Sequence, residues 1–247
     1  MIVEALNTLE VESGDTVLIH SDLTALRGEA NRTWGEAAEK LKQEVLQQLG
    51  PRGTLLVPTF NWDFCWGKPY IHERSMSHLG MFSNSVLFDK RAVRSIHPMF
   101  SFAGIGENTK TIFSQIGRSS FGKNSVFERL LRHNIKIILV NCRSDIAFVH
   151  YVEQQKKVGY RFMKYFRGDV FVNNENIGGT YDFFARRKSD RSSFNGEGLY
   201  KLFIDKGIMK ETVGVDGYPV CCVNCQDCDT VLSEKLDHSP NFLRKEN

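Results

Sequence analysis

Short apolar runs alternate along the chain with longer stretches whose apolar residues recur at helical spacing. TVLIH (16–20), TLLVPTF (54–60) and IKIILVNC (135–142) are rich in β-branched residues and predict buried strands. Between the first two, WGEAAEKLKQEVLQQLG (34–50) predicts a helix, which ends at Gly50-Pro51. This order predicts an α/β fold with a largely parallel central sheet flanked by helices.

The pattern changes near residue 159. Before that point two further helices are expected, over 83–91 and 125–134. After it, residues 159–187 are aromatic and turn-rich and predict an antiparallel ribbon or lid, and the end of the chain predicts two strands and a final helix. We therefore expect a single domain over 1–247, with an α/β body over 1–158 and a β-rich antiparallel addition in the C-terminal third, over 159–247.

Composition and charge exclude several classes of protein. Hydrophobic residues make up 41% and charged residues 25% of the 247 positions, which is ordinary for a globular domain. A net charge of +3 is too small to indicate a nucleic-acid partner. No apolar run approaches the roughly 18 residues of a membrane span, and the acidic N-terminal segment does not resemble a signal peptide. We expect a cytoplasmic protein with neither a membrane nor a nucleic-acid partner.

Four of the six cysteines lie close together in CCVNCQDC (221–228). The segment contains two overlapping Cys-x-x-Cys steps, a spacing that metal sites use. Zinc prefers four ligands, however, and no second cysteine pair follows, the nearest candidate being His238. Buried packing of free thiols explains the cluster without a metal. We expect no metal, and the alternative is a structural metal site in a nucleic-acid-binding protein.

Polar residues follow three of the predicted strands, in HSDLTAL (20–26), PTFNWDF (58–64) and CRSDIAFVHYVE (142–153). In α/β sheets ligands bind at the carboxyl ends of parallel strands, so these segments are candidates for a site. The chain lacks the phosphate-binding GxxxxGK[ST] and GxGxxG loops and the GxSxG nucleophile motif. Simple NTPase, dinucleotide-binding and serine-hydrolase interpretations are therefore excluded.

Two segments carry candidate chemistry. His150 and Glu153 are three residues apart, so on a helix the carboxylate can orient the imidazole as a general base. A solvated ion pair is the alternative. In RSIHPMFSFAGIG (94–106), polar residues are interleaved with Gly104 and Gly106, which suggests close approach of the backbone to a ligand, and a serine-capped loop is the alternative.

Five motifs occur in an order that resembles the aminoglycoside 3-N-acetyltransferase family. They are HSDLTAL, GPRGTLLVPTF, RSIHPMFSFAGIG, FGKNSVFERLL and HYVE. The resemblance covers residues 14 to about 165, and GVDGYPVCC with the last helix is similar to the closing elements of that family. It implies acetyl-CoA as acyl donor, direct transfer to a small-molecule amine and no metal.

The resemblance also implies roles for individual residues. The loop after the first strand would hold the pantetheine and phosphates of CoA, and Asp22 replaces the second serine usual in the family. The cofactor-binding positions implied are Ser21, Asp22, Leu23, Thr24, Thr59, Phe60, His97 and Ser101. His150 matches the general base, Glu153 is the expected orienting carboxylate with Asp182 as its rival, and backbone amides would stabilise the oxyanion.

The charge of the C-terminal third bears on the acceptor. Residues 156–191 contain nine Lys and Arg against four Asp and Glu, a net charge of +5. Such a balance disfavours a polycation, so we expect an anionic acceptor, for example a nucleotide-linked amino sugar of surface-polysaccharide synthesis. The alternatives are an aminoglycoside 3-N-acetyltransferase that confers antibiotic resistance, and a CoA-binding homologue without turnover, which the departure at Asp22 suggests. The sequence does not indicate an oligomeric state.

Overall fold

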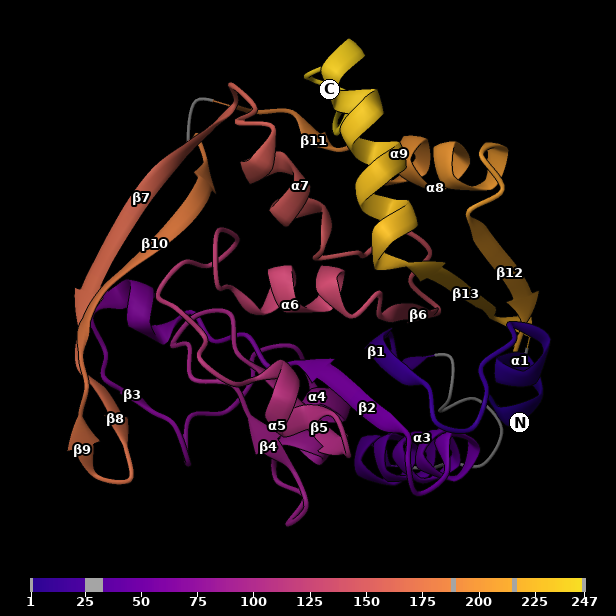
Figure 1. Ribbon diagram of the computed structural model, residues 1–247, viewed down its shortest axis with the longest axis horizontal. Coiled ribbons are helices and arrows are strands. Elements are labelled where there is room, and N and C mark those ends of the chain that lie inside the picture. Colours follow the sequence, from indigo (N-terminus) through magenta and orange to yellow (C-terminus); the bar gives the residue numbers. More distant parts are fainter. Residues whose placement is uncertain (1, 25–32, 188–189, 215–216, 246–247) are drawn as a thin grey trace.

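A seven-stranded sheet in the order β12-β13-β6-β1-β2-β5-β4 forms the centre of the computed structural model (Figure 1). The structure describes residues 2–24, 33–187, 190–214 and 217–245, so residues 25 and 26 of the first loop motif and Lys188 of the basic segment lie outside the described residues. The strands of this sheet are β1 Thr16–Ser21, β2 Thr54–Pro58, β4 Val93–Arg94, β5 Phe102–Gly106, β6 Lys136–Val140, β12 Met209–Val213 and β13 Pro219–Asn224.

The sheet is parallel only at its centre. Strand β1 pairs in parallel with β2 and with β6, while the four outer pairings are antiparallel. Parallel neighbours need long crossover connections, whereas β4–β5 and β12–β13 follow one another closely along the chain and form hairpins. The predicted α/β class and its β-rich addition are confirmed, and the parallel part is limited to the three strands with continuous apolar runs.

Alternate residues of each central strand enter two separate cores. Val17 and Ile19 face a core shared with helices α1, α3 and α4, whereas Leu18 faces a second core shared with α6, α7 and α9. The helices are α1 Ile2–Thr8, α3 Trp34–Leu49, α4 Met81–Leu87, α5 Thr109–Ile112, α6 Val126–Arg132, α7 Val149–Gln155, α8 Gly196–Asp205 and α9 Cys225–His238, with a 3₁₀ turn η1 at Asp63–Trp66. The period of two along a strand therefore produces a three-layer arrangement.

Local sequence signals fix several helix ends. Thr33 and Glu36 form a capping box at the start of α3, and the Gly50 N–H bonds back to the Leu46 carbonyl at its end. Ser125 caps α6 by accepting a hydrogen bond from the Glu128 N–H. The helix expected over 83–91 is present but begins earlier, at Met81, directly after Gly80.

The C-terminal third adds the predicted antiparallel ribbon, which runs along one side of the molecule (Figure 1). It pairs β7 Arg161–Gly168 with β10 Gly179–Arg186 over eight residues each. The smaller sheets contain β3 Tyr70–Ile71, β8 Val170–Val172 and β9 Glu175–Asn176, and separately β11 Ser193–Phe194 with β14 Arg244–Lys245. The expected two strands and final helix are β12, β13 and α9, and α8 precedes them.

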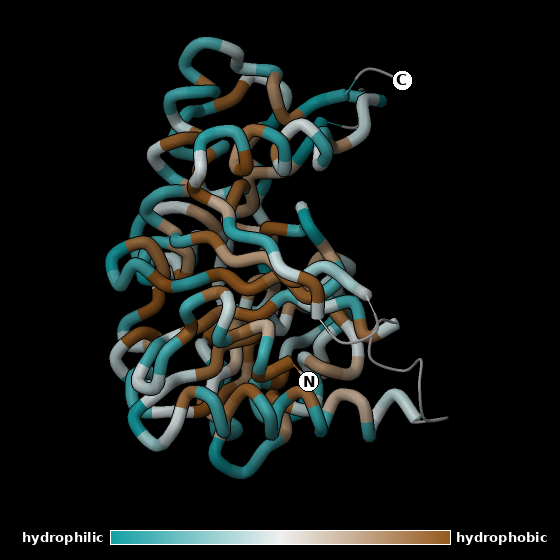
Figure 2. The backbone as a smooth tube through the Cα atoms, turned by 90° about the vertical axis from the view of Figure 1, so that its right-hand side faces the viewer, coloured by the Kyte–Doolittle hydropathy of each residue, from teal (hydrophilic) through white to brown (hydrophobic). Residues whose placement is uncertain are grey.

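Hydropathy follows this layering. The most hydrophobic stretches of the backbone run through the interior, and the hydrophilic ones lie on the outer turns and helix faces (Figure 2). None of the helices within the described ranges has the length and apolar character needed to cross a bilayer.

Arg94 joins three loops next to the sheet. Its Nη1 donates to the carbonyl oxygens of His72 and Ser75, at 2.9 and 2.7 Å, and its Nε donates to Ser101 Oγ at 3.1 Å. Its guanidinium carbon lies 5.0 Å from the centre of the Tyr70 ring. The side chain therefore supplies donors to backbone carbonyls of a loop that follows the end of β3.

Replacing Arg94 by Met therefore leaves polar groups unsatisfied in a partly buried place. We expect Arg94→Met to lower the free energy of unfolding by about 3 kcal/mol in chemical denaturation. Arg91→Met is the matched control and should cost less than about 1 kcal/mol, because the Arg91 guanidinium is exposed and Asp89 keeps its ion pair with Lys42. Equal losses in the two variants would contradict the structural role of Arg94.

Candidate active site

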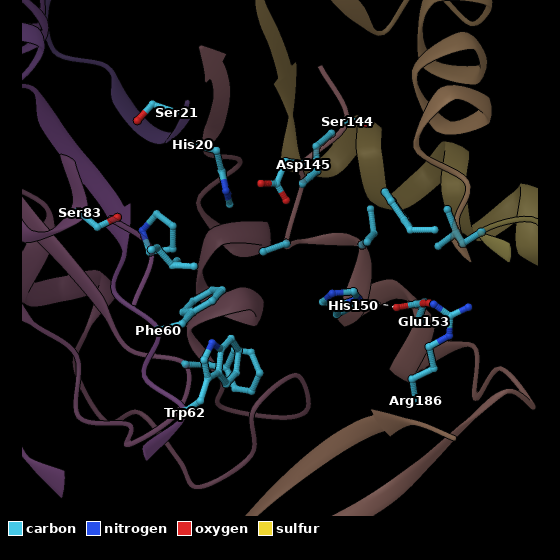
Figure 3. Close-up of a pocket in the computed structure, with 18 of the residues that line it drawn as sticks. His20, Ser21, Phe60, Trp62, Ser83, Ser144, Asp145, His150, Glu153 and Arg186 are labelled. Atoms are coloured by element: carbon cyan, nitrogen blue, oxygen red, sulfur yellow. Dashed lines mark hydrogen bonds and ion pairs between the residues drawn. The ribbon is translucent and has the colours of Figure 1, made fainter. Parts of the chain in front are cut away.

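A cavity of about 450 Å³ opens beyond the carboxyl ends of β1, β2 and β6 (Figure 3). Its walls come from segments far apart in the sequence, because the crossover topology brings the strand ends to one edge. The polar and charged residues that line it are His20, Ser21, Ser83, Ser144, Asp145, His150, Glu153, Tyr160, Arg161, Arg186 and Arg244. Aromatic and aliphatic side chains, among them Phe60, Trp62 and Phe100, form the remainder.

The centre of the site is a histidine held by a carboxylate. His150 and Glu153 lie one turn apart on α7, and His150 Nδ1 is 2.6 Å from Glu153 Oε2. A carboxylate only accepts hydrogen bonds, so this contact keeps the proton on Nδ1 and leaves the Nε2 lone pair for other work. The His150 side chain is 31% exposed at the cavity, whereas that of Glu153 is 2% exposed. This is the geometry of a base oriented by a buried carboxylate.

Two residues that follow the helix also contact the Glu153 carboxylate. The Tyr160 hydroxyl donates to Glu153 Oε1 at 2.7 Å, and Arg161 Nε lies 2.9 Å from Glu153 Oε2. Arg161 Nη2 is also 3.0 Å from His150 Nδ1, and because both groups are donors when Nδ1 donates to Glu153, this approach is a close contact held by the shared carboxylate. The sequence does not predict either residue as part of the site, because both follow a turn after the helix and no helical spacing connects them to Glu153.

Burial and hydrogen bonding act in opposite directions on Glu153. Burial alone would raise its pKa, but hydrogen bonding and charge from His150, with Arg161 and Tyr160, lower the pKa below its ordinary value. Burial and the neighbouring Glu153 carboxylate raise the pKa of Tyr160, so its hydroxyl stays protonated and continues to donate. Glu153 is therefore ionised at neutral pH although it lies in the core.

The loop after β1 borders a second space of about 420 Å³, which shares Ser21, Leu79 and Phe82 with the first. Asp22, Leu23 and Thr24 line it. The two spaces are therefore adjacent, and together they make up the path that extends from this loop to His150. Hydroxyl groups and apolar side chains along the path suit the pantetheine arm of acetyl-CoA, so the described residues fit that group.

The unusual Asp22 has a local role. Its Oδ1 accepts hydrogen bonds from the Thr24 N–H and hydroxyl, at 2.9 and 2.7 Å. Asn141, which has a positive φ of 57°, places its side-chain amide 3.4 Å from Asp22 Oδ2. The carboxylate therefore closes the turn and links it to the end of β6.

The other four residues expected to face the cofactor lie in two kinds of place. Phe60 lines the cavity. Thr59 and Ser101 are fully buried and bond to each other at 2.9 Å, with Arg94 beside them. His97 is buried and its Nδ1 accepts from the N–H groups of Met99 and Phe100. These last three residues hold backbone segments and are not among the side chains that line the cavity.

Asp182 lies apart from His150. Its Oδ1 accepts hydrogen bonds from the Ser119 hydroxyl at 2.9 Å and from the Ser120 N–H at 3.1 Å. It thereby attaches the ribbon strand β10 to the loop before α6. Of the two carboxylates suggested by sequence, only Glu153 contacts the imidazole.

One end of the cavity is basic. Arg186 Nε lies 2.8 Å from Asp190 Oδ2, and Arg244 Nη2 lies 3.0 Å from Asp190 Oδ1, so two guanidinium groups share one carboxylate. Hydrogen bonds from Arg186 and Ser192 hold the pKa of Asp190 well below its ordinary value. Both arginines line the cavity, as do Phe194 of β11 and Leu243, which directly precedes β14. A net positive charge therefore remains at this end.

The cysteine cluster lies away from the cavity. Cys221, Cys222, Cys225 and Cys228 are all buried, two on β13 and two on α9. Over the part of the chain that the structure describes, no group of three or more His, Cys, Asp or Glu is placed to hold a metal ion. Burial raises the pKa of Cys222 to about 11, and it also raises those of Cys225 and Cys228.

The fold and the cavity define an α/β protein with a carboxylate-held histidine at the strand ends. Comparison with known proteins then gives the family: the model of the aminoglycoside 3-N-acetyltransferase family matches residues 18–234. The chain therefore belongs to this family and is an acetyl-CoA-dependent N-acyltransferase, as the resemblance of its motifs predicted.

Solved structures share the fold at low sequence identity. Aminoglycoside acetyltransferase AAC(3)-Xa has a TM-score of 0.82 and 18% identity, covering 99% of this chain and 93% of its own. AAC-IIIb in its binary complex with CoASH has a TM-score of 0.81 and 13% identity, covering 96% and 95%. The YokD protein from Bacillus subtilis has a TM-score of 0.78 and 17% identity, covering 96% and 98%. No curated protein matched the sequence.

The raised thiol pKa values predict slow cysteine chemistry. At pH 8 the thiols of Cys225 and Cys228 stay protonated, so Ellman's reagent should modify all six cysteines in denaturant but leave these two unmodified in the native protein. Mass spectrometry of the trapped products locates the protected residues. Metal analysis should find no stoichiometric zinc, and zinc bound with the cluster protected would instead support a structural metal site.

Proposed function

We propose that this protein acetylates an amino group of an aminoglycoside by direct transfer, with His150 as general base. The observation that carries the proposal is the 2.6 Å contact between His150 Nδ1 and the buried Glu153, which directs the Nε2 lone pair of the imidazole into the cavity. Membership of the aminoglycoside 3-N-acetyltransferase family supports this class of acceptor.

Different residues bind the acyl donor and accept the proton. Ser21, Leu23 and Thr24 border the path that suits the pantetheine arm, and acetyl-CoA supplies a thioester carbonyl that an amine can attack. His150 Nε2 takes the proton that the acceptor nitrogen loses as its bond to the acyl carbon forms. Glu153 stabilises the resulting imidazolium, and Tyr160 and Arg161 keep the carboxylate in place.

An anionic amino sugar is the second candidate acceptor. Arg186 and Arg244 line the cavity. Within the described residues, the ion pairs of both guanidinium groups go to one carboxylate, that of Asp190. The remaining positive charge favours a phosphate or carboxylate on the acceptor. A binding role without turnover is less well supported, because Asp22, the residue that suggested it, already closes the β1 turn.

Variants of the two carboxylates and of His150 test the base. His150→Ala should lower kcat by 10²- to 10⁴-fold, the range of general-base catalysis, while CoA binding measured by calorimetry is retained. Glu153→Gln should lower kcat by about 10- to 100-fold, because the imidazole loses its orienting acceptor. Asp182→Asn should change kcat by less than about threefold. A larger loss for Asp182→Asn than for Glu153→Gln would reverse the assignment of the orienting carboxylate.

A panel of acceptors separates the two candidates. Thiol release from acetyl-CoA is followed with a kanamycin-type aminoglycoside, with a nucleotide-linked amino sugar and with a neutral amino sugar. The first candidate predicts the highest kcat/KM for the aminoglycoside, and the second predicts it for the anionic sugar. Arg244→Gln should raise KM about 10-fold for an anionic acceptor only, since it removes a charge that a polycation does not use. Failure of every amine would overturn the proposed function.

A further inference from the structure

A second histidine points into the same cavity as His150. His20 is the fifth residue of β1, and Figure 3 shows its imidazole directed into the cavity next to Asp145. The residue is 8% exposed, and its Nε2 atom is buried and has no hydrogen-bond partner. Neither the general-base proposal nor the turn at Asp22 uses it.

The strand period explains why His20 faces His150. Leu18 faces the core that contains α7, and His20, two residues further on, lies on the same side of the sheet. The imidazoles of His20 and His150 therefore approach one space from different elements, β1 and α7 (Figure 3). An apolar side chain at this position would fill the wall without cost, whereas an unpartnered buried nitrogen costs about 1–3 kcal/mol.

His20 is uncharged at neutral pH. Burial lowers its pKa to about 4, although the charge of Asp145 acts against this shift. A neutral imidazole has one N–H donor and one acceptor nitrogen. His20 can therefore donate a hydrogen bond from the buried wall of the cavity. Because it is uncharged and weakly basic, it does not compete with His150 for the proton of the acceptor.

We propose that the Nε2–H of His20 donates a hydrogen bond to the carbonyl oxygen of the acetyl thioester and stabilises the negative charge that develops there. The inference rests on the proposed function and adds a residue to it, in the role for which sequence analysis expected backbone amides. A preorganised donor of this kind contributes most inside a low-dielectric cavity. His20 is thus assigned to the acyl group and His150 to the amine.

The step balances without any further reactant. The lone pair of the acceptor nitrogen forms the N–C bond, and the C–S bond breaks with its electron pair going to sulfur. The proton lost by nitrogen passes to His150 Nε2 and then to the thiolate. His20 donates its hydrogen bond throughout and transfers no proton.

Two substitutions at His20 separate a donor from a packing role. His20→Leu removes the N–H, and we expect kcat to fall by 10²- to 10³-fold, the loss typical of one missing oxyanion donor. His20→Gln keeps a neutral N–H close to the position of Nε2 and should recover at least tenfold of that loss. His133→Leu, at an exposed position on the end of α6, controls for the substitution itself and should leave kcat unchanged.

Binding gives a readout that does not depend on turnover. The trifluoromethyl ketone S-(3,3,3-trifluoro-2-oxopropyl)-CoA forms a neutral tetrahedral hydrate with an oxygen that can accept a hydrogen bond where the developing oxyanion would lie, while free CoA has no such oxygen. By calorimetry, His20→Leu should weaken the ketone at least 10-fold and leave the Kd of CoA within about twofold. A wild-type preference for the ketone that survives in His20→Leu would overturn the proposal, as would equal kcat values for His20→Leu and the wild type.

The outcomes remain distinct from those of the proposed function. A wild-type protein that acetylates no amine would overturn the proposed function, and the ketone measurement would still decide the role of His20. If the His20→Leu variant does not fold, it will fail to bind CoA, and the His20→Gln variant then decides the proposal. In that case, a His20→Gln variant that binds CoA normally but the ketone no better than CoA contradicts the donor role.

Discussion

The buried carboxylate of Glu153 is the constraint on which the site depends. An ionised carboxylate in a core is strongly unfavourable unless its charge and its acceptor positions are matched. Here His150, Tyr160 and Arg161 all contact this carboxylate. Their hydrogen bonds and charges together lower the pKa of Glu153, although burial acts to raise it. The three come from the start of α7, the loop after it and the first residue of β7. One charge therefore connects the helix that holds His150 to the ribbon that follows it.

The cavity contains three regions that differ in their electrostatic character. Around Glu153, charged groups hold the imidazole of His150 at its Nδ1 atom. The wall at the end of β1 is instead neutral, because burial lowers the pKa of His20 to about 4. Arg186, Arg244 and Asp190 form a third region, where positive charge exceeds negative charge. Each region follows from the local balance between burial and available partners rather than from the net charge of the chain, which is only +3.

The sequence predicted what depends on local spacing. The helix at α3, the strands β1, β2 and β6, the β7–β10 ribbon and the His150–Glu153 pair all follow from periodicity or short motifs. The strand β4 did not, because it has only two residues. The strands β12 and β13 were expected, but their antiparallel pairing at the edge of the central sheet depends on tertiary packing. Tyr160 and Arg161 depend on the turn after α7. Thr59, His97 and Ser101 match family motifs in position, yet their side chains turn toward Arg94 or nearby backbone, which only tertiary packing determines.

The short pairing of β11 with β14 has a consequence for how the cavity exchanges its contents. Only two residue pairs join these strands, and together they bring Phe194, Leu243 and Arg244 to the wall. Local opening has a lower free energy where few hydrogen bonds and few apolar contacts must be broken. The opposite wall belongs to the central sheet, where β1 is paired on both edges. By strand pairing alone, the wall at β11 and β14 is held less firmly than the wall formed by the central sheet, so the contents of the cavity exchange more readily on that side.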